Sequence, residues 1–176
     1  INNFTESGFY SKFSEKLSNF NTWYSNCYRT RMNEINGKVW NKDFLKNIFL
    51  NKDSKFLIVL NPKKIICGGL LFIETNSQIE VFMISVLSNY FSNDASNCLT
   101  DFLYNYANSK KISYINWQRS SNSKVSIFKK KWKSEEINIP HIHYYNNNRE
   151  LNNITKDFLI ENFHDLYIYP FDKIKL

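Results

Sequence analysis

The stretch INWQRSSNSKVSIFKKKWKSEE, residues 115–136, holds side chains that could bind an anionic group. Arg119 and Ser120 follow an apolar run at 112–117, and this run indicates a strand. Ligands commonly bind at the carboxyl ends of strands in open α/β sheets, where an arginine can hold a carboxylate or phosphate through two parallel hydrogen bonds. The alternative is that Arg119 pairs with a nearby acid while Ser120 or Ser121 caps the next helix.

That next helix is expected over 122–133. Val125, Phe128 and Trp132 are spaced three and four residues apart and are expected to face the core. The lysines spread around the remaining surface, where they are most simply solvated: Lys129, Lys130, Lys131 and Lys133.

Two histidines, His141 and His143, alternate along a predicted strand and would share one face. No third metal ligand lies at a recognisable spacing, so we expect no metal site. His143 is instead a candidate general base, because the pKa of an imidazole lies near neutrality. Tyr90 is a candidate phenol acid, with amphipathic packing as the alternative.

The composition bears on partners and on the cellular compartment. The net charge of +7 and the pI near 9.2 allow a basic RNA-binding domain, although AT-rich codons favour the same Lys, Asn and Ile content. Three distant cysteines indicate reduced, buried thiols. The longest apolar run, IICGGLLFI, is too short to span a bilayer, and no signal peptide is visible. We therefore expect a cytoplasmic protein, trimmed or excised from a longer chain because it starts without methionine.

The predicted elements alternate in a way that defines the fold class. Their order is α-α-β-β-β-α-β-α-β-α, which predicts one α/β domain over residues 1–176, with a mixed central sheet and helices on both faces. The helices are expected at 8–30, 41–50, 92–111, 122–133 and 154–166. The strands are expected at 56–60, 65–73, 78–86, 112–117 and 137–145.

Three pieces of sequence carry a resemblance to a known family. They are YRTRMN at 28–33, FLIVLNPKKIICGGLLFIE at 56–74, and Arg119-Ser120 followed by Phe128-Lys129 and Trp132. Together with the order of elements, they resemble the GNAT acyltransferase superfamily, and most closely its branch of Fem-type peptidyltransferases and GNAT-like acetyltransferases. The resemblance covers roughly residues 8–160. It departs from the family pattern at Lys133, where members usually carry glycine.

The resemblance implies an acyltransferase with an activated acyl donor and an amine acceptor on a small molecule, sugar or peptide. It also implies substrate contacts for Lys129 and Arg31. Members often carry two such modules in tandem, so this chain could be the carboxyl-terminal half of a protein with a second GNAT-like domain. A non-catalytic copy of the fold and the basic RNA-binding domain are the alternatives.

The donor is left open by the segment after the third predicted strand. Family members that use acyl-CoA carry a glycine-rich phosphate loop there, but SNYFSNDASNC at 88–98 has neither glycine nor a basic residue. Asp94 would moreover complement the dipole of the helix that follows. The pyrophosphate loop of an acyl-CoA donor is therefore not evident, and an aminoacyl-tRNA or an acyl carrier is the alternative donor.

The resemblance also implies where the acyl carbonyl would be polarised. In this fold the third and fourth strands separate, here near Val86 and Trp117, and the backbone at the end of the third strand faces the gap. By position this backbone belongs to Ile84, Ser85 and Val86, which would otherwise be ordinary sheet residues.

Overall fold

The computed structural model describes residues 8–92, 94–118 and 123–137, and of residues 123–125 it describes the backbone only. The chain divides into two compact units, residues 1–129 and residues 130–176. The predicted strand at 137–145 and the predicted helix at 154–166 lie outside the described residues, apart from Ile137.

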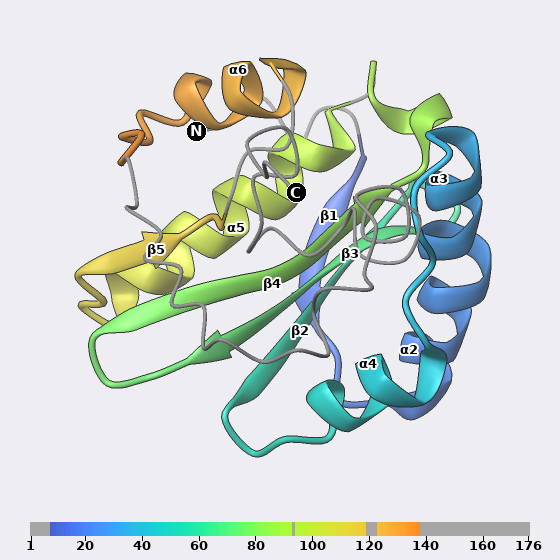
Figure 1. The fold of residues 1–176 in the computed structure, drawn as a ribbon, viewed down its shortest axis with the longest axis horizontal. Coiled ribbons are helices and arrows are strands. Elements are labelled where there is room, and N and C mark those ends of the chain that lie inside the picture. The colour runs from blue at the N-terminus through green and yellow to red at the C-terminus, as the bar shows by residue number, and fades with distance from the viewer. Residues whose placement is uncertain (1–7, 93, 119–122, 138–176) are drawn as a thin grey trace, which may run out of the picture. The chain divides into compact units, whose positions relative to one another are not determined.

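A five-stranded mixed sheet forms the centre of the first unit (Figure 1). Its strands lie in chain order: β1 (Tyr10–Phe13), β2 (Ser54–Leu60), β3 (Ile66–Glu74), β4 (Gln78–Val86) and β5 (Tyr114–Asn116). The first four are antiparallel to their neighbours, and β5 runs parallel to β4. The mixed α/β class predicted from the sequence is confirmed.

The first predicted element was wrong at its start, because residues 10–13 form an edge strand and the helix begins only at Leu17. Phe9 and Phe13 are four residues apart, which is one helical turn but also two strand repeats. Tertiary packing selects the strand. The ring of Phe13 lies 4.8 Å from that of Tyr106 and 5.5 Å from that of Phe102, between ring centroids.

Helices cover both faces of the sheet (Figure 1). On one face lie α2 (Leu17–Trp23), a π-helical turn η1 (Tyr24–Tyr28), α3 (Arg29–Glu34) and α4 (Lys42–Phe49). Asn41 caps α4 by accepting from the N–H groups of Asp43 and Phe44. On the other face lies α5 (Ala95–Ser109), after a 3-10 turn η2 (Ser88–Tyr90); α6 (Ser123–Lys131) follows β5.

Alternation along the strands builds two cores. In β2, Phe56, Ile58 and Leu60 face the layer of α2 to α4, whereas Leu57 and Val59 face α5. Both sets are almost completely buried. A strand covered on both faces reads as a continuous apolar run, which is why FLIVL showed no polar alternation.

A β-bulge at Phe82 reverses the alternation within β4. Before it, Ile79 and Val81 pack with the α5 core, and the register against β3 shifts between Leu71 and Phe72. After it, Val86 packs in that same core although its position is even-numbered. The bulge therefore turns the odd-numbered residues after it towards α2 to α4.

The three cysteines are buried, as predicted, and none forms a disulfide. Burial raises the pKa of the Cys27 and Cys67 thiols to about 12, and it also raises that of Cys98. We expect thiol reagents at pH 8 to leave all three unlabelled in the native protein and to label three after denaturation. Labelling stoichiometry by mass spectrometry measures this; rapid native labelling of Cys27 or Cys67 would contradict it.

The same thiols give the folded state a pH dependence. The pKa of an unfolded thiol is near 9.0, whereas burial in the fold raises the pKa of Cys27 and Cys67 to about 12. A pKa that is higher in the folded state stabilises the fold below pH 9, and this contribution is lost as the pH rises from 9 towards 12.

The second unit is described only over residues 130–137. Lys130 and Glu136 form an exposed ion pair at 2.9 Å, and Lys133 has a left-handed backbone with φ of 58°. Among the helices that the structure describes across both units, none is long and apolar enough to cross a membrane.

Candidate functional site

Within the described ranges, the edge of β4 beyond β3 is unpaired along most of its length. β5 pairs with β4 only over the first three residues of β4, Gln78 to Glu80. From Val81 to Val86, no strand in the described part of the chain pairs with this edge. The two strands therefore part after Glu80 and Asn116, well before the end of β4. The resemblance had implied that they part near Val86 and Trp117.

Backbone geometry decides which groups face this opening. The N–H of Leu87 donates to the carbonyl oxygen of Cys67 on β3 at 3.0 Å. Hydrogen-bonded and non-bonded pairs alternate along an antiparallel ladder, so Ser85 also bonds to β3. The N–H groups of Ile84 and Val86 then point to the opposite side, into the opening. Fixed N–H donors of this kind can polarise a carbonyl group.

Side chains join β4 to the end of β5 at the point where the strands part. The amide Nε2 of Gln118 donates to Glu80 Oε2 at 2.7 Å, and Gln118 has a left-handed backbone with φ of 58°. Lys129 Nζ donates to the carbonyl oxygens of Trp117 and Gln118 at 2.7 and 2.8 Å. The ammonium of Lys129 therefore holds the end of β5, while its contact with a substrate stays a prediction.

The helical layer supports β4 from behind. Trp23 Nε1 donates to the carbonyl oxygen of Ser85 at 3.4 Å, and Ser85 Oγ donates to the carbonyl oxygen of Cys27 at 3.4 Å. The side chain of Ser85 thus points into the layer of α2 to α4. A Cβ atom on Gly69 would lie 2.8 Å from the Trp23 ring, so glycine is needed for this close approach.

The loop after β4 is tied to the end of α3. Arg31 pairs with Glu34 at 3.0 Å and stacks over the ring of Phe91, with its guanidinium carbon 4.9 Å from the ring centroid. Ser88 Oγ donates to the other carboxylate oxygen of Glu34 at 2.9 Å. Arg31 was predicted to contact substrate; the structure brings it to this loop, beside the last residues of β4.

The start of α5 lacks the features of a phosphate site among the described residues. The helix expected from residue 92 begins only at Ala95, and Asp94 is the residue immediately before it, with a left-handed backbone. Its carboxylate accepts from Asn97 Nδ2 at 2.8 Å and does not cap a helical N–H. A carboxylate at this end still opposes phosphate binding there.

The remaining predicted site residues fall into two groups. Tyr90 packs its ring on Phe9, and its hydroxyl accepts from Asn61 Nδ2 at 3.2 Å, so the structure uses it to join the β4 loop to the β2–β3 turn. Arg119, Ser120 and His143 lie outside the described residues. No group of three or more His, Cys, Asp or Glu side chains in the described ranges could hold a metal ion.

Sequence reasoning missed an aromatic trio beside the opening. Phe82, two residues beyond the last β4 residue paired with β5, contacts Trp40 and Phe44, with ring centroids 5.9 and 6.1 Å apart. Trp40 and Phe44 stack at 5.1 Å yet are 38% and 44% exposed. The signal in the sequence was a tryptophan directly before the polar Asn41, outside the apolar face predicted for the helix at 41–50.

Trp40 is held in place by its own backbone. Its N–H donates to the hydroxyl of Tyr28 at 3.0 Å, and its carbonyl oxygen accepts from the hydroxyl of Tyr24 at 2.8 Å. Both tyrosines are buried members of the π-helical turn. Irregular turns of this kind frequently occur at functional sites, and this one presents a half-exposed indole beside the opening.

A mixed sheet with an antiparallel meander, a parallel fifth strand and helices on both faces is the fold of GNAT acetyltransferases, and solved structures agree with this class. A possible acetyltransferase from Clostridium difficile 630 is 13% identical, with a TM-score of 0.64, over 78% of this chain and 97% of the other. The aminoglycoside acetyltransferase meta-AAC0020 from an uncultured soil metagenomic sample, in complex with sisomicin, is 13% identical with a TM-score of 0.64, over 80% of this chain and 97% of the other.

Glucosamine-6-phosphate N-acetyltransferase from Arabidopsis thaliana is 10% identical with a TM-score of 0.55, over 78% of this chain and 99% of the other. Comparisons with protein-family models and with curated proteins find no match. The structural neighbours are therefore GNAT-fold acetyltransferases, and their likeness to this chain is one of fold.

Proposed function

We propose that this protein is an acyltransferase that moves an acyl group from an activated donor to an amine. The observation that carries the proposal is the open edge of β4, where the N–H groups of Ile84 and Val86 face the opening left by β5. A donor carbonyl bound there would have its developing negative charge stabilised by two fixed donors. The acetyltransferase neighbours support the same reaction type.

The reaction needs one bond made and one broken. The uncharged amine nitrogen attacks the donor carbonyl carbon, the new C–N bond forms, and the carbon–sulfur or carbon–oxygen bond to the carrier breaks. The amine proton passes to a base and the leaving group takes up a proton. We propose His143 as the base, and Arg119 with Ser120 for an anionic group of a substrate, on sequence grounds.

We further propose that the acyl donor is bound without a glycine-rich phosphate loop. In the described part of the loop after β4, backbone N–H groups donate to carbonyl oxygens of the same loop: that of Tyr90 to Leu87, and that of Phe91 to Ser88. The carboxylate of Asp94 lies directly before α5 and opposes a phosphate there. An aminoacyl-tRNA, as in the Fem-type branch, or an acyl carrier fits this better than acyl-CoA. A second GNAT-like domain and a cytoplasmic setting belong to the same proposal.

A donor and acceptor panel tests the function. The protein would be incubated with acetyl-CoA, an acylated carrier protein and charged tRNA, each with an aminoglycoside, glucosamine 6-phosphate and a peptide amine. We expect acylated product by mass spectrometry with at least one pair, and much less product with Arg119→Ala. If no pair gives product above the protein-free rate, the proposal fails and the non-catalytic alternative is favoured.

The aromatic trio leads to a prediction about the acceptor. Exposed indole and phenyl faces attract cationic or apolar groups, so the trio is a suitable wall for the acceptor. We expect Trp40→Ala to raise the acceptor KM about tenfold while changing kcat little, since one such contact contributes ~1–2 kcal/mol. Initial rates at varied acceptor concentration measure this.

The control for Trp40→Ala is Ile65→Ala, which also removes an exposed apolar side chain but lies in the β2–β3 turn. Its KM should match that of the wild-type protein. An unchanged acceptor KM in Trp40→Ala would remove the trio from the acceptor site.

A further inference from the structure

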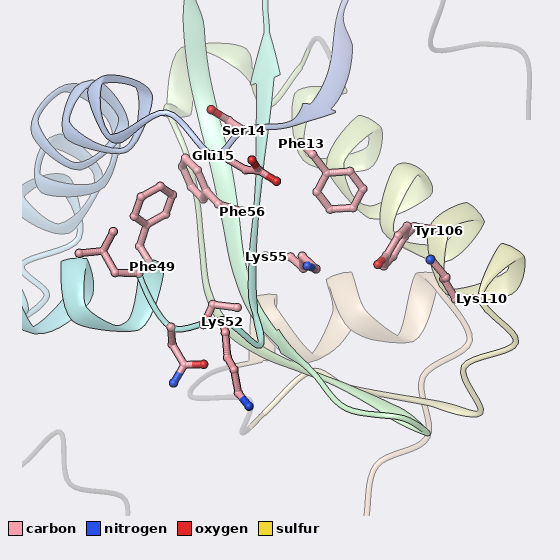
Figure 2. Close-up of a pocket in the computed structure, with 12 residues that line it drawn as sticks. Phe13, Ser14, Glu15, Phe49, Lys52, Lys55, Phe56, Tyr106 and Lys110 are labelled. Atoms are coloured by element: carbon pink, nitrogen blue, oxygen red, sulfur yellow. The ribbon is translucent and has the colours of Figure 1, made fainter.

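A pocket of about 480 Å³ lies near the beginning of β2, away from the opening (Figure 2). Its walls come from the end of β1, the end of α4, the start of β2 and the last turns of α5. Its volume is within the range of small-molecule sites.

Strand direction separates this pocket from the open edge of β4. β2 and β4 are both antiparallel to β3, so they run in the same direction. Ser54 begins β2, which places the pocket at the end of the sheet where β4 also begins. The opening lies along the later part of β4, at the other end of the sheet. In addition, β3 lies between β2, which lines the pocket, and β4, which lines the opening. The pocket is therefore a separate site.

The charges around the pocket are unbalanced. Three lysines line it, Lys52, Lys55 and Lys110, against one acid, Glu15. Within the described ranges none of these four forms an ion pair. Lys55 is half-buried and lies centrally among the labelled lining residues in Figure 2, whereas Lys52 and Lys110 are exposed. Lys110 lies over the ring of Tyr106, with its ammonium 6.0 Å from the ring centroid. In the described part of the chain the three lysines thus have no acid partner, and a bound anion would supply one.

Aromatic rings flank the lysines. Phe49 lies on one side of Lys55, and Phe13 and Tyr106 lie on the other (Figure 2). Phe13 is 37% exposed, and the hydroxyl of Tyr106 is fixed by donating to the Glu74 carboxylate. Such rings offer faces and edges against which a flat ligand ring can pack.

The pocket wall includes the hydroxyl of Ser54. Its Oγ is buried and makes no hydrogen bond within the part of the chain that the structure describes. Almost all buried hydroxyls in native proteins are satisfied, and an exception calls for a ligand or an ordered water as the missing partner.

We propose that this pocket binds a small anion that carries a flat aromatic ring, of the nucleoside monophosphate class. Lys55 and Lys110 contact the phosphate, Lys52 adds positive charge at the rim, and the ring packs against Phe13 or Phe49. The site is independent of acyl transfer, because the opening in the sheet lies elsewhere.

Calorimetric titration of the whole chain with adenosine 5′-monophosphate tests this, with adenosine and inorganic phosphate as partial ligands. We expect one saturable site for the nucleotide and at least about tenfold weaker binding of either part alone. The variant Lys55→Gln/Lys110→Gln should weaken nucleotide binding by at least about tenfold. Lys63→Gln, which removes an exposed lysine in the β2–β3 turn, should bind as the wild-type protein does.

Because Lys55 is half-buried, Lys52→Gln/Lys110→Gln serves as a second variant that changes only exposed lysines. It should also bind at least severalfold more weakly, with an unchanged thermal unfolding midpoint. The proposal is overturned by the absence of saturable nucleotide binding. Equal binding by wild type and both double variants, or binding of an RNA oligonucleotide without binding of the mononucleotide, would overturn it as well.

Discussion

Val86→Pro is expected to lower kcat for acyl transfer by about 10²- to 10³-fold, the usual effect of removing one donor that stabilises an oxyanion. Proline has no N–H, so the substitution removes one of the two donors that face the opening. The N–H of Val86 points away from β3, so no ladder hydrogen bond is lost. Proline is tolerated at such edge-facing positions.

Val86→Ala is the matched control. Val86 is 3% exposed and packs over Gly68, so both substitutions lose core contacts at a cost of about 1–2 kcal/mol in the free energy of unfolding. Only the proline variant loses the N–H group. Equal kcat values for the two variants, from single-turnover assays with the donor found in the panel, would show that this N–H does not act in the reaction.

Trp23→Ala is expected to lower the free energy of unfolding by about 3–5 kcal/mol, a large part of the 5–15 kcal/mol typical of a domain. The indole is completely buried, with its ring centroid 5.2 Å from that of Phe56 and 5.6 Å from that of Tyr28. Its N–H also holds the carbonyl oxygen of Ser85 on β4. Urea unfolding followed by circular dichroism measures the loss.

The comparison for Trp23→Ala is the same change at Trp40, whose ring is 38% exposed. Trp40→Ala should cost much less, because exposed atoms lose little burial free energy. A loss below about 1 kcal/mol for Trp23→Ala would mean that the layer of α2 to α4 packs on the sheet differently.

Much of the sheet could be predicted because its central strands are apolar runs between turn residues. FLIVL and IICGGLLFI lie within two residues of the observed β2 and β3, and QIEVFMISV coincides with β4. Asn61 and Pro62 mark the turn between the first two. The edge strand β1 was missed, because the spacing of Phe9 and Phe13 fits both periods and only packing on α5 decides between them.

The candidate site was less predictable for a different reason. The bulge at Phe82 decides which β4 residues face each core, and QIEVFMISV carries no glycine or other local mark of it. The resemblance implied that the strands part near Val86 and Trp117, whereas the last observed pair is Glu80 and Asn116. The choice of Ile84 and Val86 over Ser85 depends on the register with β3. The trio around Trp40 joins two distant segments, because Trp40 and Phe44 are four residues apart but Phe82 lies on β4, and one sequence cannot bring these segments together.

Amide hydrogen exchange along β4, followed by NMR, tests the open edge most directly. Met83 and Ser85 should be protected by their bonds to β3, whereas Ile84 and Val86 should exchange far faster, since their N–H groups have no partner strand in the described part of the chain. Equal protection at all four positions would mean that another strand closes this edge and that no acyl group can enter there.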